Sequence, residues 1–352
     1  MPLIQTQSLL FRAMEEARPG AVWQNLFREF WPSYRRWYLQ SGEAARPYYL
    51  PCVRALRKHM PELLPTYEAL SELSGGGDVE ARFLSLFCPP PYVTGCSQLV
   101  WPGERPLLVR NYDYPPQLCE GVILKTAWNG REVIGLSDCM WGLLDGINED
   151  GLVVALSFGG RQEVGEGFGV PLVLRYVLET CTRTDEACAA LARVPVHMSY
   201  NVTVVDRSGD FSTVFLAPGK SGDIRRLAAA TNHQKKVEWH QHARATSTVE
   251  RLRRLMEMLD DSTMTSEALI AAFLRPPIYS NAFARGLGTL YSAAYWPGEG
   301  RADFFWPGVS WSQSFADFTV GDRLIEFGAS PPPPNNDTRG MDLREETSNE
   351  GR

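Results

Sequence analysis

The fold is decided by residues 95–113, which read GCSQLVWPGERPLLVRNYD. Two apolar runs, residues 97–101 and 106–111, flank the turn residues Pro102-Gly103-Glu104-Arg105, and this pattern is typical of a β-hairpin. A turn at Gly103-Glu104 would place Cys96 opposite Asn111 and make Asp113 its diagonal neighbour on the same face. Arg110 would then face the other side of the hairpin unless a bulge brought it round.

Cys96 is the one cysteine among seven that follows a glycine. Glycine permits strained backbone conformations and leaves its carbonyl open to attack. A thiol at the next residue can attack the Gly95 carbonyl, move the acyl group from nitrogen to sulfur, and free Cys96 as a new N-terminus once the thioester is hydrolysed. An α-amine has a pKa of about 7.7–8.0, so it can act as the general base for its own thiol. Taken alone, the dipeptide is more typical of a structural cysteine after a turn.

Polar residues that suit this chemistry follow along the chain. Asp113 could hold a new ammonium group, and Arg110 could favour the thiolate or bind a substrate carboxylate. Asn232, in Thr231-Asn232-His233, ends an alanine-rich strand, and Asn201 begins an apolar strand. An asparagine amide at a strand end can donate to the oxyanion of a tetrahedral intermediate. Taken singly, each of these residues also fits a turn or the end of a strand.

The periodicity of the chain changes at the cysteine. Residues 20–95 carry aromatic and apolar side chains at intervals of three and four, which predicts helices. The remainder alternates blocks of strands with pairs of helices, and its hairpins favour antiparallel sheets with helices outside. The expected elements include helices at 170–181 and 185–193, a strand at 224–231 and a final strand at 302–306. We therefore expect an α+β fold with a helical N-terminal segment at 1–95, a catalytic domain at 96–330 and a disordered tail at 331–352.

Composition limits the classes of partner. The 352 residues are 44% hydrophobic and 22% charged, with a net charge of −6, which fits a globular protein. The charges are mixed along the chain, so no nucleic-acid partner is expected. No apolar run is long enough for a signal peptide or a membrane span, and the seven cysteines are irregularly spaced. These absences predict a cytoplasmic protein without a membrane partner.

Three other interpretations fit parts of the sequence. A papain-like protease would need a histidine base and a cysteine that opens a helix rather than a strand. A metal site is disfavoured because Cys181 and Cys188 fall on apolar helix faces. A binding protein that has kept the fold without catalysis, or a chain that is never processed, remains the serious alternative. Loss of the cysteine, the aspartate or the asparagine would mark such a protein, and all three are present.

Four motifs occur in an order that resembles a known family. They are Gly95-Cys96-Ser97, Arg110-Asn111-Tyr112-Asp113-Tyr114, Gly146-Ile147-Asn148-Glu149-Asp150-Gly151-Leu152 and Thr231-Asn232-His233. Together they resemble the acyl-coenzyme A:isopenicillin N acyltransferase family, whose wider relatives are choloylglycine hydrolases and penicillin V acylases. The similarity runs from about residue 60 to about residue 310.

The resemblance implies a four-layer αββα sandwich, a precursor cleaved between Gly95 and Cys96, and chemistry on linear amide bonds. It implies that Cys96 is the nucleophile and that Asp113 orients the α-amine of Cys96, with Arg110 as a charged residue beside it. Asn232 would either form part of the oxyanion hole or orient the amine. Three residues are secondary candidates: Asn201, His233 and Arg285.

Two positions depart from the family pattern. Ser97 stands where threonine is frequent, which keeps a hydroxyl. Gln234 stands where an aromatic residue commonly follows Asn-His, which changes the pocket wall beside Asn232.

The resemblance also indicates the partners. We expect a small-molecule amide or acyl-thioester substrate, no metal and no bound cofactor, with a coenzyme A thioester as the conceivable acyl donor. The aromatic residues before Cys96 would expose an apolar stripe if they left, so the products of cleavage are expected to stay together as a two-chain heterodimer.

Overall fold

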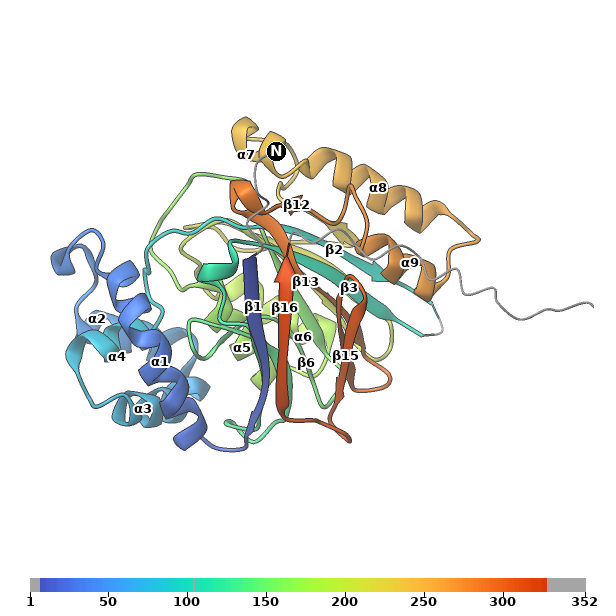
Figure 1. Ribbon diagram of the computed structural model, residues 1–352. Coiled ribbons are helices and arrows are strands. Elements are labelled where there is room, and N and C mark those ends of the chain that lie inside the picture. The colour runs from blue at the N-terminus through green and yellow to red at the C-terminus, as the bar shows by residue number, and fades with distance from the viewer. Residues whose placement is uncertain (1–6, 104, 328–352) are drawn as a thin grey trace, which may run out of the picture.

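The computed structural model describes residues 7–103 and 105–327, and the tail predicted at 331–352 lies outside them. Two β-sheets pack face to face between two layers of helices (Figure 1). Helices α5 (Val170–Thr180) and α6 (Thr184–Arg193) cover the outer face of one sheet. Helices α8 (Thr248–Asp260) and α9 (Ser266–Phe273) cover the other. The α+β αββα sandwich expected from the sequence is confirmed.

The first sheet has nine strands in the order β10-β9-β8-β7-β6-β5-β4-β1-β16. Its neighbours are antiparallel, except that β1 and β4 run parallel. The strands are β1 Gln7–Glu16, β4 Val122–Thr126, β5 Val133–Asp138, β6 Gly142–Asn148, β7 Val153–Phe158, β8 Tyr200–Val205, β9 Phe211–Leu216, β10 Asp223–Arg225 and β16 Gly321–Phe327.

The second sheet runs in the order β11-β2-β3-β13-β14-β15, with β12 (Asn281–Ala282) paired to β13. All of its pairs are antiparallel. Its strands are β2 Gly95–Trp101, β3 Leu107–Asp113, β11 Ala229–Ala230, β13 Leu287–Trp296, β14 Arg301–Trp306 and β15 Val309–Ser314.

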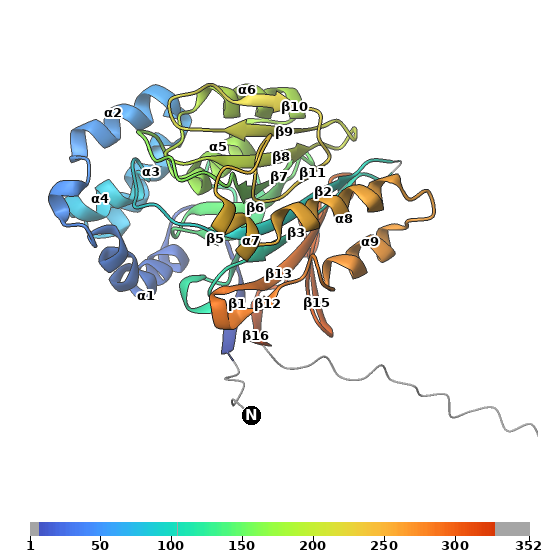
Figure 2. The same cartoon turned by 90° about the horizontal axis from the view of Figure 1, so that it is seen from above.

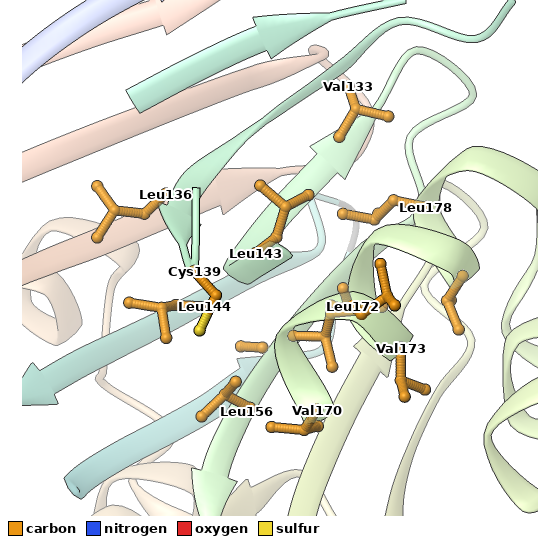
Figure 3. Close-up of a cluster of buried hydrophobic side chains, with 14 of the residues drawn as sticks. Val133, Leu136, Cys139, Leu143, Leu144, Leu156, Val170, Leu172, Val173 and Leu178 are labelled. Carbon is orange, nitrogen blue, oxygen red and sulfur yellow. The ribbon is translucent and has the colours of Figure 1, made fainter. Parts of the chain in front are cut away.

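Helix α5 packs tightly on the first sheet because two glycines of β6 admit it. A Cβ on Gly142 would lie 2.5 Å from Pro171, and one on Gly146 would lie 2.9 Å from Leu178. Figure 3 shows Leu172 and other apolar side chains of α5 beside the strands, all of them buried. Each such side chain contributes roughly 1.5–3 kcal/mol by leaving water, so this contact anchors the first sheet.

The N-terminal segment lies beside the sandwich as α1 (Ala21–Tyr38), α2 (Tyr49–His59), α3 (Leu64–Leu73) and α4 (Asp78–Leu84), as Figure 2 shows. The prediction that residues 1–95 are helical is wrong for β1, which lies between β4 and β16 in the first sheet. Phe11 and Ala13, which are two residues apart, are both buried in the core, as expected for one face of a strand. The partners of β1 come from distant parts of the chain, so local periodicity did not reveal them.

The hairpin of β2 and β3 is confirmed, but its predicted register is wrong by one residue. Cys96 pairs with Tyr112, and Ser97 pairs with Asn111. A one-residue shift moves every side chain of a strand to the opposite face. Arg110 therefore shares the face of Cys96 without a bulge, and Asp113 lies on the face that α8 and α9 cover.

The single strand expected at residues 224–231 is instead two short strands in different sheets. β10 pairs with β9 in the first sheet, and β11 pairs with β2 in the second, with Ala230 opposite Gln98. The chain therefore crosses from one sheet to the other just before Asn232. This crossing brings Asn232 next to Cys96.

Candidate active site

Cys96 lies near the start of β2 with its side chain fully buried between the two sheets. Its Sγ lies 3.3 Å from Nη2 of Arg110 and 3.6 Å from Oγ1 of Thr94. Burial raises the pKa of the Cys96 thiol, and the charge of Arg110 opposes that rise. Among the groups around the sulfur, Arg110 is therefore the one that most favours the thiolate.

Arg110 is held so that one of its nitrogens faces the sulfur. Its Nη1 pairs with the carboxylate of Asp145 on β6 and donates to the Leu144 carbonyl at 3.0 Å. The rings of Tyr112 and Tyr291 lie 5.1 and 5.6 Å from its guanidinium carbon. With Nη1 occupied, Nη2 remains for Cys96.

Asp145 has further partners on β13, which is in the opposite sheet. The hydroxyls of Tyr291 and Tyr295 both donate to its carboxylate. Asp145 and Arg110 are each fully buried, so the pair is compensated by charge and by hydrogen bonds. This cluster joins the two sheets directly behind the cysteine.

Asn232 holds the backbone nitrogen of Cys96. Its Oδ1 accepts from the Cys96 N–H at 2.9 Å and from Nη2 of Arg251 at 2.7 Å. Because both partners are donors, the oxygen rather than the nitrogen of the amide must point this way. Its Nδ2 lies 3.4 Å from the carbonyl oxygens of Thr94 and Phe158.

Asp113 reaches the cysteine indirectly. Its Oδ2 accepts from Nη1 of Arg251 at 2.9 Å, and its Oδ1 accepts from Thr289 at 2.6 Å. Burial raises the pKa of Asp113, while Arg251 and the Thr289 hydroxyl act against that rise. No direct hydrogen bond joins Asp113 to the Cys96 nitrogen in the described residues; Arg251 and Asn232 connect them.

Gly95 pairs with Asp113 across the hairpin and needs its lack of a side chain. A Cβ at this position would lie 3.0 Å from both Cβ and Oδ2 of Asp113. The glycine before the cysteine is thus explained by the close approach of the aspartate. Nothing in its φ angle requires glycine.

Two of the three secondary candidates support the segment that carries Asn232. Nδ2 of Asn201 donates to the carbonyls of Thr231 and His233, at 2.7 and 3.1 Å. His233 contacts the Thr248 hydroxyl at 2.9 Å, and burial lowers the pKa of its imidazole. Neither side chain forms a hydrogen bond with Cys96. Arg285 lies exposed in a short 3₁₀ turn (Phe283–Arg285) and is not brought to this cluster.

Sequence reasoning missed Arg251 and Asp145. Arg251 is 1% exposed although Arg253 and Arg254 on the same helix are exposed. A signal for it exists, because Arg251 continues the buried stripe of Thr248, Leu255 and Met258 at helical spacing. Asp145 had no such local signal, since its partners come from β3 and β13.

A histidine base for the cysteine is not found here. None of the hydrogen bonds among the described residues joins a histidine to the Cys96 sulfur. His242, on α7 (His240–Ala245), instead contacts the Thr94 carbonyl at 3.2 Å. No group of three or more metal-binding side chains occurs within residues 7–103 and 105–327. No helix in that same part of the chain is both long and apolar enough to cross a bilayer.

A family model described as acyl-coenzyme A:6-aminopenicillanic acid acyl-transferase matches residues 100–311. The match spans well over half of the sequence, and the chain belongs to this family. The class that this family defines is that of acyl transferases. The matched region begins just after Cys96. A search of curated proteins finds no match.

Several solved structures have a similar arrangement of elements. One is a mutant of conjugated bile acid hydrolase from Clostridium perfringens, with 13% identity, a TM-score of 0.45, and coverage of 67% of this chain and 97% of that one. A Caenorhabditis elegans N-acylethanolamine-hydrolyzing acid amidase ortholog has 16% identity, a TM-score of 0.44 and coverage of 58% and 93%. Penicillin V acylase from Agrobacterium tumefaciens has 16% identity, a TM-score of 0.42 and coverage of 64% and 84%.

Proposed function

We propose that this chain cuts itself between Gly95 and Cys96 and then uses Cys96 as the nucleophile of a linear amide hydrolase or acyltransferase. One observation carries the proposal. The nitrogen of Cys96 is held by Asn232 at 2.9 Å while its sulfur lies 3.3 Å from Arg110. A structural cysteine needs neither contact, whereas a residue that supplies both nucleophile and base needs both.

Self-cleavage begins with attack of the Cys96 sulfur on the Gly95 carbonyl carbon. The C–S bond forms, the C–N bond breaks, and the proton of the thiol passes to the departing nitrogen, which becomes the α-amine. Asn232 already accepts a hydrogen bond from that nitrogen. Water then hydrolyses the thioester, which leaves a carboxylate on Gly95 and a free thiol on Cys96.

The same groups then serve an external amide. The α-amine takes the proton of its own thiol, and Arg110 stabilises the thiolate through its contact with the sulfur. Departure of the Thr94 carbonyl frees Nδ2 of Asn232 to donate to the oxyanion of the tetrahedral intermediate. Water or an amine finally releases the acyl group from Cys96.

Access for that substrate depends on cleavage. The sulfur of Cys96 is fully buried while residues 89–94 remain attached. The two products are proposed to stay together as a heterodimer, since α1 buries Trp23, Leu26 and Phe27. A coenzyme A thioester would be the acyl donor in the transferase version of the reaction, and a cytoplasmic location stays a prediction.

Intact-mass spectrometry under denaturing conditions tests the proposal. The parent is expected to give two fragments that meet at Gly95/Cys96, and Cys96→Ala a single chain. Cys188→Ala, a buried cysteine on α6, serves as the matched control and should cleave as the parent does. A single full-length chain in the purified parent, stable on prolonged incubation, would leave the unprocessed or non-catalytic binding protein as the better explanation.

A further inference from the structure

A cavity of about 370 Å³ opens between α1 and the loop that follows β3. Five aromatic rings form its walls, and the floor is made by Glu120, Asp138 and Cys139. Its volume lies within the range of small-molecule sites. The aromatic residues are Phe30, Tyr34, Trp37, Tyr92 and Tyr114.

All of the charged side chains that line this cavity are acidic. Its lining contains three carboxylates and no lysine, arginine or histidine. Glu29 at the rim is paired with Arg12. Neither Glu120 nor Asp138 forms an ion pair with any of the described residues. Two carboxylates in a largely buried site without a cation are costly to keep ionised.

The two floor carboxylates compete for one hydroxyl. The Tyr34 hydroxyl lies 2.5 Å from Oε1 of Glu120 and 3.2 Å from Oδ1 of Asp138. It also accepts the Cys139 N–H, so its single proton serves only one carboxylate at a time. Glu120 has two further donors, Met140 N–H and the Ser137 hydroxyl. The carboxylate of Asp138 has only the adjacent Cys139 beside the shared tyrosine hydroxyl, so it is the less saturated of the two carboxylates that line the cavity.

The cavity is linked to the cysteine through two tyrosines whose rings are tilted against each other. Tyr112 pairs with Cys96 across the hairpin, and its ring lies 5.7 Å from the ring of Tyr114, which lines the cavity. Tyr92, which also lines the cavity, precedes Cys96 by four residues. A molecule bound here would therefore lie close to the segment that carries the Cys96 sulfur.

We propose that this cavity binds the organic ammonium group of the substrate, so that the enzyme acts on amides that carry a positive charge near the scissile bond. The faces of aromatic rings attract an alkylammonium ion, and Asp138 supplies the counter-charge. The inference rests on the proposed function of Cys96. It also gives the N-terminal segment a lasting role, because α1 and Tyr92 contribute to the wall of the cavity.

Binding is tested on the full-length Cys96→Ala chain, so that the result does not depend on cleavage or turnover. Calorimetry with n-butylammonium chloride, against 1-butanol at matched ionic strength, separates charge from hydrophobic contact. We expect the ammonium ion to bind at least tenfold more tightly than the alcohol. Asp138→Asn should weaken ammonium binding at least fivefold, whereas Asp317→Asn, an exposed aspartate outside the cavity, should not.

A second variant keeps the proposal testable if Asp138→Asn fails to fold. Trp37→Leu keeps both carboxylates and removes one ring from the wall, and it should weaken ammonium binding while leaving that of 1-butanol unchanged. Equal binding of the ion and the alcohol, or ammonium binding unaffected by both variants, would overturn the proposal. Self-cleavage of the parent would still stand in that case, and its failure would leave the calorimetric result intact, so the two hypotheses fail separately.

Discussion

Nη2 of Arg251 donates to Oδ1 of Asn232 at 2.7 Å, although one residue belongs to α8 and the other follows β11. The same guanidinium binds Asp113 and Ser97. Arg251 thus fixes which atom of the asparagine meets the Cys96 nitrogen. It connects the outer helix layer to the bond that we propose is cleaved.

Replacement of Arg251 by methionine should abolish or greatly slow self-cleavage, because Asn232 loses the donor that orients its amide. Asp113 would also remain as a buried carboxylate without its cation, and breaking such a pair costs about 3–5 kcal/mol. Intact mass over time reports cleavage, and chemical denaturation reports stability. Arg254→Ala, on the exposed face of the same helix, should leave stability within about 0.5 kcal/mol of the parent. Normal cleavage in Arg251→Met would contradict this role.

Gly95→Ala should slow cleavage as well as destabilise the chain. The added methyl group would press on Asp113 at 3.0 Å, and overpacking of this kind costs about 1–3 kcal/mol. Gly103→Ala, in the turn of the same hairpin, has open space around it and provides the control. The half-time of cleavage, followed by intact mass, should lengthen in the first variant only. Similar half-times in both variants would argue against the steric explanation.

The rate of self-cleavage should rise with pH, because the thiolate is the nucleophile and burial raises the pKa of the Cys96 thiol. Arg110 opposes that rise, so its removal should move the rate profile to higher pH by about 1 to 3 pH units. Half-times measured from pH 6 to pH 9 test this.

The informative variant for that profile is the double mutant Arg110→Met/Asp145→Asn, which removes both charges of the buried pair. Arg110→Lys keeps the positive charge and should shift the profile less. A profile that stays in place in the double mutant would exclude Arg110 as the group that supports the thiolate.

Acid should destabilise the folded chain through His242. Burial lowers the pKa of His242 to about 4, whereas an unfolded histidine has a pKa of about 6.5. Between these values the unfolded chain binds the proton and the folded chain does not, so stability falls as pH drops from about 6.5 to 4, by at most about 1.4 kcal/mol per pH unit.

Urea unfolding of the parent and of His242→Gln at pH 7.5 and pH 5 measures that difference. Glutamine can still donate to the Thr94 carbonyl but does not titrate. The gap in unfolding free energy between parent and variant should therefore change with pH, and a constant gap would count against the assignment.

Local patterns predicted most of the sandwich, because hairpin turns and amphipathic helices are encoded by neighbours in sequence. The helices expected at 170–181 and 185–193 differ from α5 and α6 by only a residue at their ends. Strands β15 and β16 were missed, since the predicted order ended at Trp306. The α+β class could be predicted without these two strands, because it was inferred from the hairpins, which indicate antiparallel sheets.

The site was harder to predict than the fold, for a geometric reason. Register decides which residues share a face, and one extra residue in the turn exchanged the positions of Arg110 and Asp113 relative to Cys96. The structure places Arg110 and Asn232 in contact with Cys96, while the catalytic roles that the resemblance implies for them stay predictions. Asp113 contacts Arg251 rather than Cys96, and no hairpin argument could supply that contact.

The position of strand β1 bears on the order of folding and cleavage, and on refolding after denaturation. It precedes Cys96 in the chain, yet it completes the first sheet between β4 and β16. A chain cut at Cys96 would hold two polypeptides in one hydrogen-bonded sheet, and residues 96–352 made alone would expose two unpaired strand edges, which invite aggregation. Folding would therefore have to come before the proposed cut. Once cut, the molecule could regain its structure after denaturation only by a bimolecular encounter, whose yield would depend on protein concentration.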